Sequence, residues 1–213
     1  MAYVPDLDQM LHAGARYADE HAEYAIEPHL IGEVTLPAGQ VAGCDPLVYS
    51  GDAPPFTVAV PPGRYPLRAW VAVLYRGDTE RQRRVAALQL IIRNAPATRW
   101  QPALVEGQDL SALGEDEYFG YVVDSGTGTL ADVSAVRALA TWDYQRLEDV
   151  FIPVQLPERP VPGAVAAVTD EQSGANIITV TSGWGDGQYP TFIGHTAGGD
   201  ISSLVTDFLV LPA

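Results

Sequence analysis

The sequence contains no lysine and very little cysteine or methionine. Its 12 basic residues are all arginine, and its 213 residues include one cysteine and two methionines. The single cysteine, Cys44, excludes an intrachain disulfide, which fits a reducing compartment. Cys44 has no neighbouring histidine in the sequence, so we predict a buried, unreactive thiol rather than a nucleophile.

Long apolar runs and a secretory leader are also missing. The chain begins MAYVPDLDQMLHAG, which has no basic region followed by an apolar run, so we expect no signal peptide. No stretch approaches the ~18 uninterrupted apolar residues of a membrane span. We therefore predict a cytoplasmic protein. No sharp change of composition divides the chain, so we expect a single domain over residues 1–213.

Positive charge is scarce. The chain has 27 acidic against 12 basic residues, a formal net charge of −15. Such a field repels nucleic acid and anionic membranes, so we exclude both as partners. It favours a basic protein or a cation, although solubility is the simplest reason for an acidic surface.

Glycine and proline are abundant, at 20 and 17 residues, and they separate short apolar segments. This texture is typical of strands joined by turns. Residues 64–75 and 84–93 alternate apolar and polar positions around a polar turn, which predicts a hairpin. Further strands are expected at residues 118–123, 176–181, 189–194 and 201–210. The predicted fold is mainly β: an antiparallel β-sandwich or open barrel, with an N-terminal helix and one internal helix.

The two helices are predicted from apolar spacing. In residues 5–24 the side chains of Leu7, Met10, Leu11 and Tyr17 can share one helical face, although Gly14 weakens the pattern. We expect an N-terminal helical segment at 1–30, followed by a β-rich body at 31–213. Residues 132–142 form the internal helix, with Asp132 as its N-cap.

The stretch VVDSGTG at residues 122–128 resembles the catalytic turn of aspartic proteases. That chemistry needs two carboxylates that share one proton. Asp124 and Asp186 are the catalytic candidates, with a symmetry mate as another source of the second carboxylate. The glycines also fit a dinucleotide-binding turn, but the flanking strands argue against a Rossmann unit. An ordinary β-turn explains the same residues.

Residues 182–200 read SGWGDGQYPTFIGHTAGGD, a second glycine-rich stretch. We predict that Gly183, Gly185 and Gly187 bend the backbone while Trp184 and Tyr189 anchor the loop in the core. A competing hypothesis is an aromatic platform of Trp184, Tyr189 and Tyr121 for a sugar or other small ligand. The ligand-binding candidates are Trp184, Asp186, Tyr189, His195 and Asp207.

We predict no metal and no cofactor, because no metal loop or phosphate loop is complete. A looser metal site has no diagnostic spacing; its residues would be Asp186, Asp200, Asp207 and His195. The other histidines are predicted to lie at the surface or at caps. A functional site requires that the aspartates at turns converge, whereas scattered ones indicate scaffolding. The aspartates in question are Asp45, Asp124, Asp132, Asp186 and Asp207.

Several segments occur in a familiar order. They are LPAGQVAGCDPL (36–47), VPPGRYPLRAWVAV (60–73), RVAALQLII (84–92), TRW (98–100), GYVVDSGTGTLAD (120–132) and SGWGDGQYPTFIGHTAGGDISSLVTDF (182–208). Together they resemble an uncharacterised bacterial family, domain of unknown function 4241, which is common in actinobacteria. The resemblance implies one β-rich unit from about residue 30 onward. It implies no catalytic residues.

The leading hypothesis is a non-enzymatic binding protein whose acidic surface engages or neutralises a basic protein. It rests on the net charge and on the lack of a complete catalytic constellation. Two alternatives stay open: an aspartate-dependent hydrolase built on Asp124, and a small-ligand or carbohydrate-binding protein built on the glycine-rich stretch.

Overall fold

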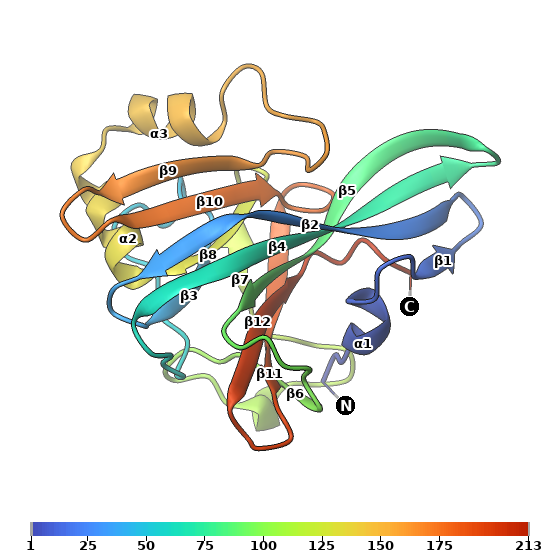
Figure 1. The fold of residues 1–213 in the computed structure, drawn as a ribbon, viewed down its shortest axis with the longest axis horizontal. Helices are drawn as coiled ribbons and strands as arrows, with labels where there is room; N and C mark the ends of the chain where they lie inside the picture. The colour runs from blue at the N-terminus through green and yellow to red at the C-terminus, as the bar shows by residue number, and fades with distance from the viewer. Residues whose placement is uncertain (1, 213) are drawn as a thin grey trace.

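The computed structural model describes residues 2–212 and contains two antiparallel sheets (Figure 1). The larger sheet has the order β1 (Arg16–Ala18), β2 (Glu23–Leu36), β4 (Gly63–Arg76), β5 (Thr79–Ile91), β12 (Ile201–Asp207), β11 (Gly187–His195) and β6 (Arg99–Pro102), and β7 (Gly120–Val123) also pairs with β11. The smaller sheet has the order β3 (Val41–Cys44), β8 (Thr127–Asp132), β10 (Ala175–Thr181) and β9 (Val165–Asp170). The predicted mainly antiparallel β fold is confirmed.

The smaller sheet is buried on both faces. Leu130 and Ile178 point into the main core against the larger sheet, whereas the adjacent Ala131 and Ile177 point into a second core. Helices cover that second core: α2 (Val133–Ala138), its 3₁₀ continuation η2 (Leu139–Thr141) and α3 (Tyr144–Phe151). The period-2 alternation of strands therefore builds three layers.

The internal helix and the main hairpin are confirmed. Asp132 caps α2, since its Oδ1 accepts the Ser134 N–H at 2.8 Å. β4 and β5 pair directly as a hairpin. The strands expected near residues 118–123, 176–181, 189–194 and 201–210 are β7, β10, β11 and β12.

The N-terminal helix is present, but its predicted extent over residues 5–24 is wrong. In residues 5–24 only Leu7–Met10 are helical, and they form the single turn α1. A separate 3₁₀ turn, η1 (Leu110–Ala112), precedes β7. Gly14 adopts φ +79° and its N–H donates to the Ile26 carbonyl, which turns the chain into a strand pairing. β2 then runs across the expected border at residue 30.

The glycine-rich stretch forms two turns, one before β11 and one between β11 and β12. Gly183 and Gly185 take positive φ before β11, and Gly199 takes φ +87° between β11 and β12. At Gly183 a Cβ atom would lie 2.4 Å from the Phe208 carbonyl oxygen, so only glycine fits there. Both chain ends lie on one side of the molecule, beside α1 and β1 (Figure 1). Within residues 2–212 no helix is long and apolar enough to cross a membrane.

Candidate functional site

The DSG turn is held by a carboxylate from another part of the chain. Asp45 Oδ2 accepts the backbone N–H groups of Asp124 at 3.0 Å and Ser125 at 2.8 Å. Its Oδ1 accepts the Ser125 hydroxyl at 2.8 Å and the Leu47 N–H at 2.9 Å. Asp45 is 0% exposed. The buried carboxylate of this turn is therefore Asp45, and its role is to fix the backbone.

The two catalytic candidates, Asp124 and Asp186, lie at the surface, one residue beyond the adjacent ends of β7 and β11. Val123 pairs with Gly187 across β7 and β11, so the next positions along the register are Asp124 and Asp186. Both residues are exposed to solvent. A proton-sharing dyad depends on two carboxylates forced together out of water. The exposed positions of Asp124 and Asp186 do not support that chemistry.

Trp184 differs from Tyr189 and Tyr121, which pair in register between β11 and β7, so the three rings do not form one exposed platform. Tyr189 and Tyr121 are buried, and the Tyr189 hydroxyl donates to the Gly185 carbonyl at 2.7 Å. Trp184 is 53% exposed, so the prediction that it anchors the loop in the core is wrong. Arg84 explains its position: the guanidinium lies 4.8 Å from the Trp184 ring centroid and donates to the Gly183 carbonyl.

Replacing Trp184 with alanine is expected to lower the free energy of unfolding by only about 0.5–1 kcal/mol, the usual contribution of an exposed cation–π contact. Phe208, a buried ring that packs edge-on against Tyr189, provides the comparison. Its replacement with alanine should cost about 3–5 kcal/mol. Urea unfolding of both variants measures the difference. A large loss for Trp184→Ala would place its ring in the core.

The side chains of His195 and Asp132 both contact backbone groups of turns. His195 Nδ1 lies 3.2 Å from the Gly199 carbonyl oxygen, inside the turn between β11 and β12. Asp132 accepts the N–H groups of Ala38 and Gly39 as well as that of Ser134. The described chain, residues 2–212, contains no group of three metal-ligating side chains. Burial raises the pKa of the Cys44 thiol, which keeps it protonated.

Two of the predicted ligand-binding residues lie at cavities: Tyr189 lines one of about 170 Å³ together with Tyr121, and Asp207 lies at a larger one. A cleft of about 580 Å³ opens between residues 3–10, the Tyr17–Ala18 end of β1 and residues 207–212, which begin at the last residue of β12. We call it the terminal cleft. Asp207 is 1% exposed, and its Oδ2 accepts the Tyr3 hydroxyl at 2.8 Å while its Oδ1 accepts the Leu209 N–H at 2.8 Å.

No hydrogen bond or ion pair within residues 2–212 links Asp207 to the other four aspartates. Asp45 and Asp124 meet through one backbone hydrogen bond, whereas Asp132 and Asp207 serve separate segments. Most of these aspartates are therefore turn and cap residues.

Comparison with known proteins gives one result. Residues 34–206 match the family described as protein of unknown function (DUF4241). The chain belongs to the DUF4241 family. Neither the curated proteins nor the solved structures contain a match. The terminal cleft of this DUF4241 protein is built mostly outside the matched range, since Tyr3, Tyr17 and Asp207 all lie beyond it.

The terminal cleft has no positive charge among its lining residues. Its ionisable side chains are two aspartates, Asp6 and Asp207, and two tyrosines, Tyr3 and Tyr17. Burial raises the pKa of Asp207 to about 6, opposed by the Leu209 N–H and the Tyr3 hydroxyl. Burial and the nearby acids raise the pKa of Tyr17 to about 12. Near neutral pH the cleft of this DUF4241 chain therefore presents a buried carboxylate among un-ionised phenols.

The sequence pattern did not indicate Tyr3 or Tyr17 as site residues. Asp207 is among the predicted ligand-binding residues, but its tyrosine neighbours are not. The signal in the sequence was a possible tight hairpin that places Tyr17 opposite Tyr24. The helix predicted over residues 5–24 is incompatible with that hairpin. Tyr17 and Tyr24 are register partners in β1 and β2 of the DUF4241 chain.

Proposed function

We propose that this protein is a non-enzymatic binding protein whose acidic surface engages a basic protein, with one lysine or arginine side chain of the partner entering the terminal cleft. The observation that carries the proposal is Asp207. A carboxylate buried beside a cavity without a positive partner has lost hydration, and a cation at the cavity would restore a favourable interaction.

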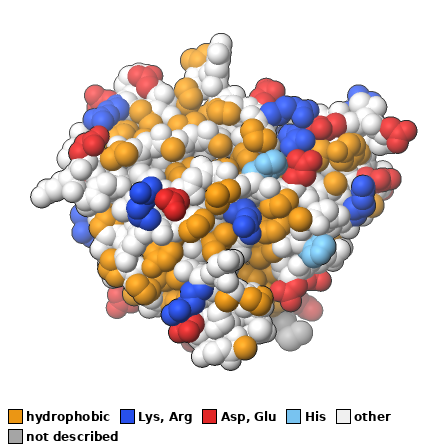
Figure 2. Space-filling model, in the orientation of Figure 1, with side chains coloured by type: hydrophobic (Ala, Val, Ile, Leu, Met, Phe, Trp, Pro, Cys, Tyr) orange, Lys and Arg blue, Asp and Glu red, His pale blue; other side chains and the backbone are white. Residues whose placement is uncertain are grey.

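An acidic loop also lies against one wall of the cleft. No basic residue occurs between Arg99 and Arg137, and the intervening loop carries Glu115, Asp116 and Glu117. The Tyr3 N–H donates to the Glu117 carbonyl at 2.9 Å, which holds this loop against the N-terminal segment. In Figure 2, red acidic side chains gather at the lower right, near the N-terminal end of Figure 1. This surface would speed the approach of a basic partner.

The aromatic and apolar walls suit a long cationic side chain. Tyr3 and Tyr17 line the cleft together with Met10. The methylene groups of lysine or arginine pack against such walls, while the charge lies near phenol rings and the carboxylate. Each Asp207 oxygen accepts one hydrogen bond and keeps a second lone pair for a donor.

An oligolysine peptide, measured by calorimetry, provides the test. We expect binding that weakens as salt rises and that becomes about tenfold weaker in Asp207→Asn, since one charge-assisted hydrogen bond is worth about 1.5–3 kcal/mol. Binding should strengthen as pH rises through about 6, where Asp207 ionises.

Glu171→Gln is the matched control. It removes the same charge at an exposed position in the turn between β9 and β10, far from the cleft (Figure 1). It should leave binding nearly unchanged. Equal losses in the two variants would mean that net charge alone attracts the peptide. An affinity for the peptide that does not change with salt concentration, or no binding at all, would contradict the proposal.

A further inference from the structure

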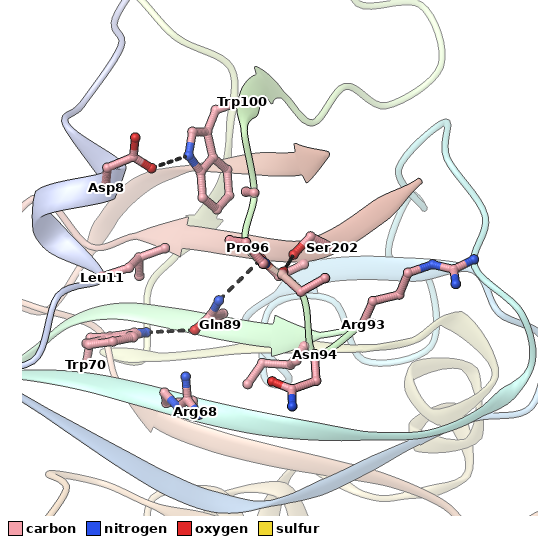
Figure 3. A pocket seen from close by; sticks show the side chains of 14 residues that line it. Asp8, Leu11, Arg68, Trp70, Gln89, Arg93, Asn94, Pro96, Trp100 and Ser202 are labelled. Atoms are coloured by element: carbon pink, nitrogen blue, oxygen red, sulfur yellow. Dashed lines mark hydrogen bonds between the residues drawn. The ribbon is translucent and has the colours of Figure 1, made fainter. Parts of the chain in front are cut away.

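A second cavity lies on the outer face of the larger sheet, beside α1 (Figure 3). Its floor is a row of side chains from three neighbouring strands. Arg68 of β4 is the register partner of Gln89 of β5, and Ile91 of β5 is the partner of Ser203 of β12. Because residues paired in register point to the same face, this row faces away from the smaller sheet. We call the cavity the sheet groove.

The polar atoms of the floor are fixed by hydrogen bonds. Trp70 Nε1–H donates to Gln89 Oε1 at 3.0 Å, and Gln89 Nε2 donates to Ser203 Oγ at 3.3 Å. Trp70 is 4% exposed and Ser203 1%. The amide oxygen of Gln89 thus accepts one hydrogen bond, and the second amide N–H of Gln89 has no partner within residues 2–212. The floor therefore offers a hydrogen-bond donor whose position is fixed by the bonds to Trp70 and Ser203.

Arg68 supplies the charge of the groove. It is half-buried, and its guanidinium lies 5.6 Å from the Trp70 ring centroid. Arg68 has no ion pair or hydrogen bond with another side chain in residues 2–212. Arg93 also borders the groove, but its side chain points away (Figure 3) and its guanidinium lies 3.4 Å from Asp200.

The two ends of the groove differ in charge. Asp8 lies at the opposite end from Arg68, where its carboxylate accepts the Trp100 Nε1–H at 3.1 Å (Figure 3). Ile91, Pro96 and Trp100 provide apolar surface in the groove, with Trp100 at the Asp8 end. A negatively charged group is therefore attracted to the Arg68 end and repelled from the Asp8 end.

We propose that the sheet groove binds a small organic monocarboxylate. The carboxylate takes two parallel hydrogen bonds from the Arg68 guanidinium, with the free Gln89 amide N–H beside it. The apolar part of the ligand lies against Ile91 and Trp100. The cavity of about 340 Å³ has the size of a small-molecule site. This site is separate from the terminal cleft and does not depend on it.

The test is a panel of small aromatic and aliphatic monocarboxylates, measured by NMR against the full chain, with each acid paired with its neutral carboxamide. We expect a subset of the acids to bind and to shift the indole N–H signals of Trp70 and Trp100, while the paired carboxamides bind at least about tenfold more weakly. No binding by any acid, or equal binding by acids and amides, would overturn the proposal.

Three variants locate the site. Arg68→Met keeps an aliphatic stem over Trp70 and should weaken the bound acids about tenfold or more. Arg68→Lys keeps the charge without the planar fork and should fall between Arg68→Met and the parent chain. Arg64→Gln removes an exposed arginine of the same strand that pairs with Glu33, and it should leave binding unchanged. Unaltered binding in Arg68→Met, in a variant whose spectrum shows the native fold, would assign the acids to another site.

Discussion

Replacing Asp45 with alanine is expected to lower the free energy of unfolding by roughly 4 kcal/mol. The substitution leaves three backbone N–H groups without their acceptor, those of Leu47, Asp124 and Ser125. Each unsatisfied buried donor costs about 1–3 kcal/mol, and partial exposure of this turn lowers the sum. Urea unfolding monitored by tryptophan fluorescence measures the loss.

Asp124→Ala is the control for that measurement. It removes a carboxylate from the same turn, but an exposed one, so the free energy of unfolding should change by no more than about 0.5 kcal/mol. If Asp124→Ala costs as much as Asp45→Ala, the turn depends on the side chain at Asp124 and the structural role assigned to Asp45 is wrong.

The second large effect is on the pH dependence of stability. The pKa of Asp207 is raised from 3.8 to about 6 in the folded chain. A carboxyl group with a raised pKa binds its proton more tightly in the folded state, so its favourable contribution is complete below about pH 4. That contribution is lost as pH rises through about 6. The loss amounts to roughly 3 kcal/mol.

Asp207→Asn removes this titration. Asparagine can accept the Leu209 N–H and donate to the Tyr3 oxygen, so its contacts resemble those of the protonated acid. The stability of Asp207→Asn relative to the parent chain should rise by roughly 3 kcal/mol between pH 4 and pH 7. Tyr3, Tyr17 and Tyr118 face the same carboxylate, but their pKa values are raised, so they stay un-ionised throughout this range.

Denaturant midpoints of both chains at several pH values, with Glu171→Gln in parallel, measure this effect. The difference between two chains cancels the titration of every other group. A difference that stays constant from pH 4 to pH 7 would show that Asp207 is not destabilised by its burial. It would also remove the main support for a cation at the terminal cleft.

The local sequence contained more information than the predictions used. Helix α3 was not predicted, yet Asp143 caps it by accepting the Arg146 N–H, and Leu147 and Phe151 are spaced four apart on its buried face. The helix predicted for residues 5–24 shows the opposite error. Its apolar spacing fits a helix for one turn, and after Gly14 the chain gains more by pairing in the sheet.

The DSG turn shows why the site could not be predicted from local pattern alone. Residues 122–128 match a catalytic turn in sequence, and the exposed Asp124 is the residue that the pattern selects. The carboxylate that defines the turn, Asp45, is 79 residues away in the chain. Similarly, Asp207 meets Tyr3 across 204 residues. No local pattern encodes contacts of that separation.

The sequence by itself determined the fold class, because alternating apolar residues and glycine turns act over a few residues and leave few arrangements besides paired strands. It also determined the acidic character and the family. Only the tertiary structure decided which carboxylates are buried and which side chains face a cavity. Those properties follow from strand register and from packing between distant segments: register brings Arg68 beside Gln89, and packing brings Tyr3 to Asp207.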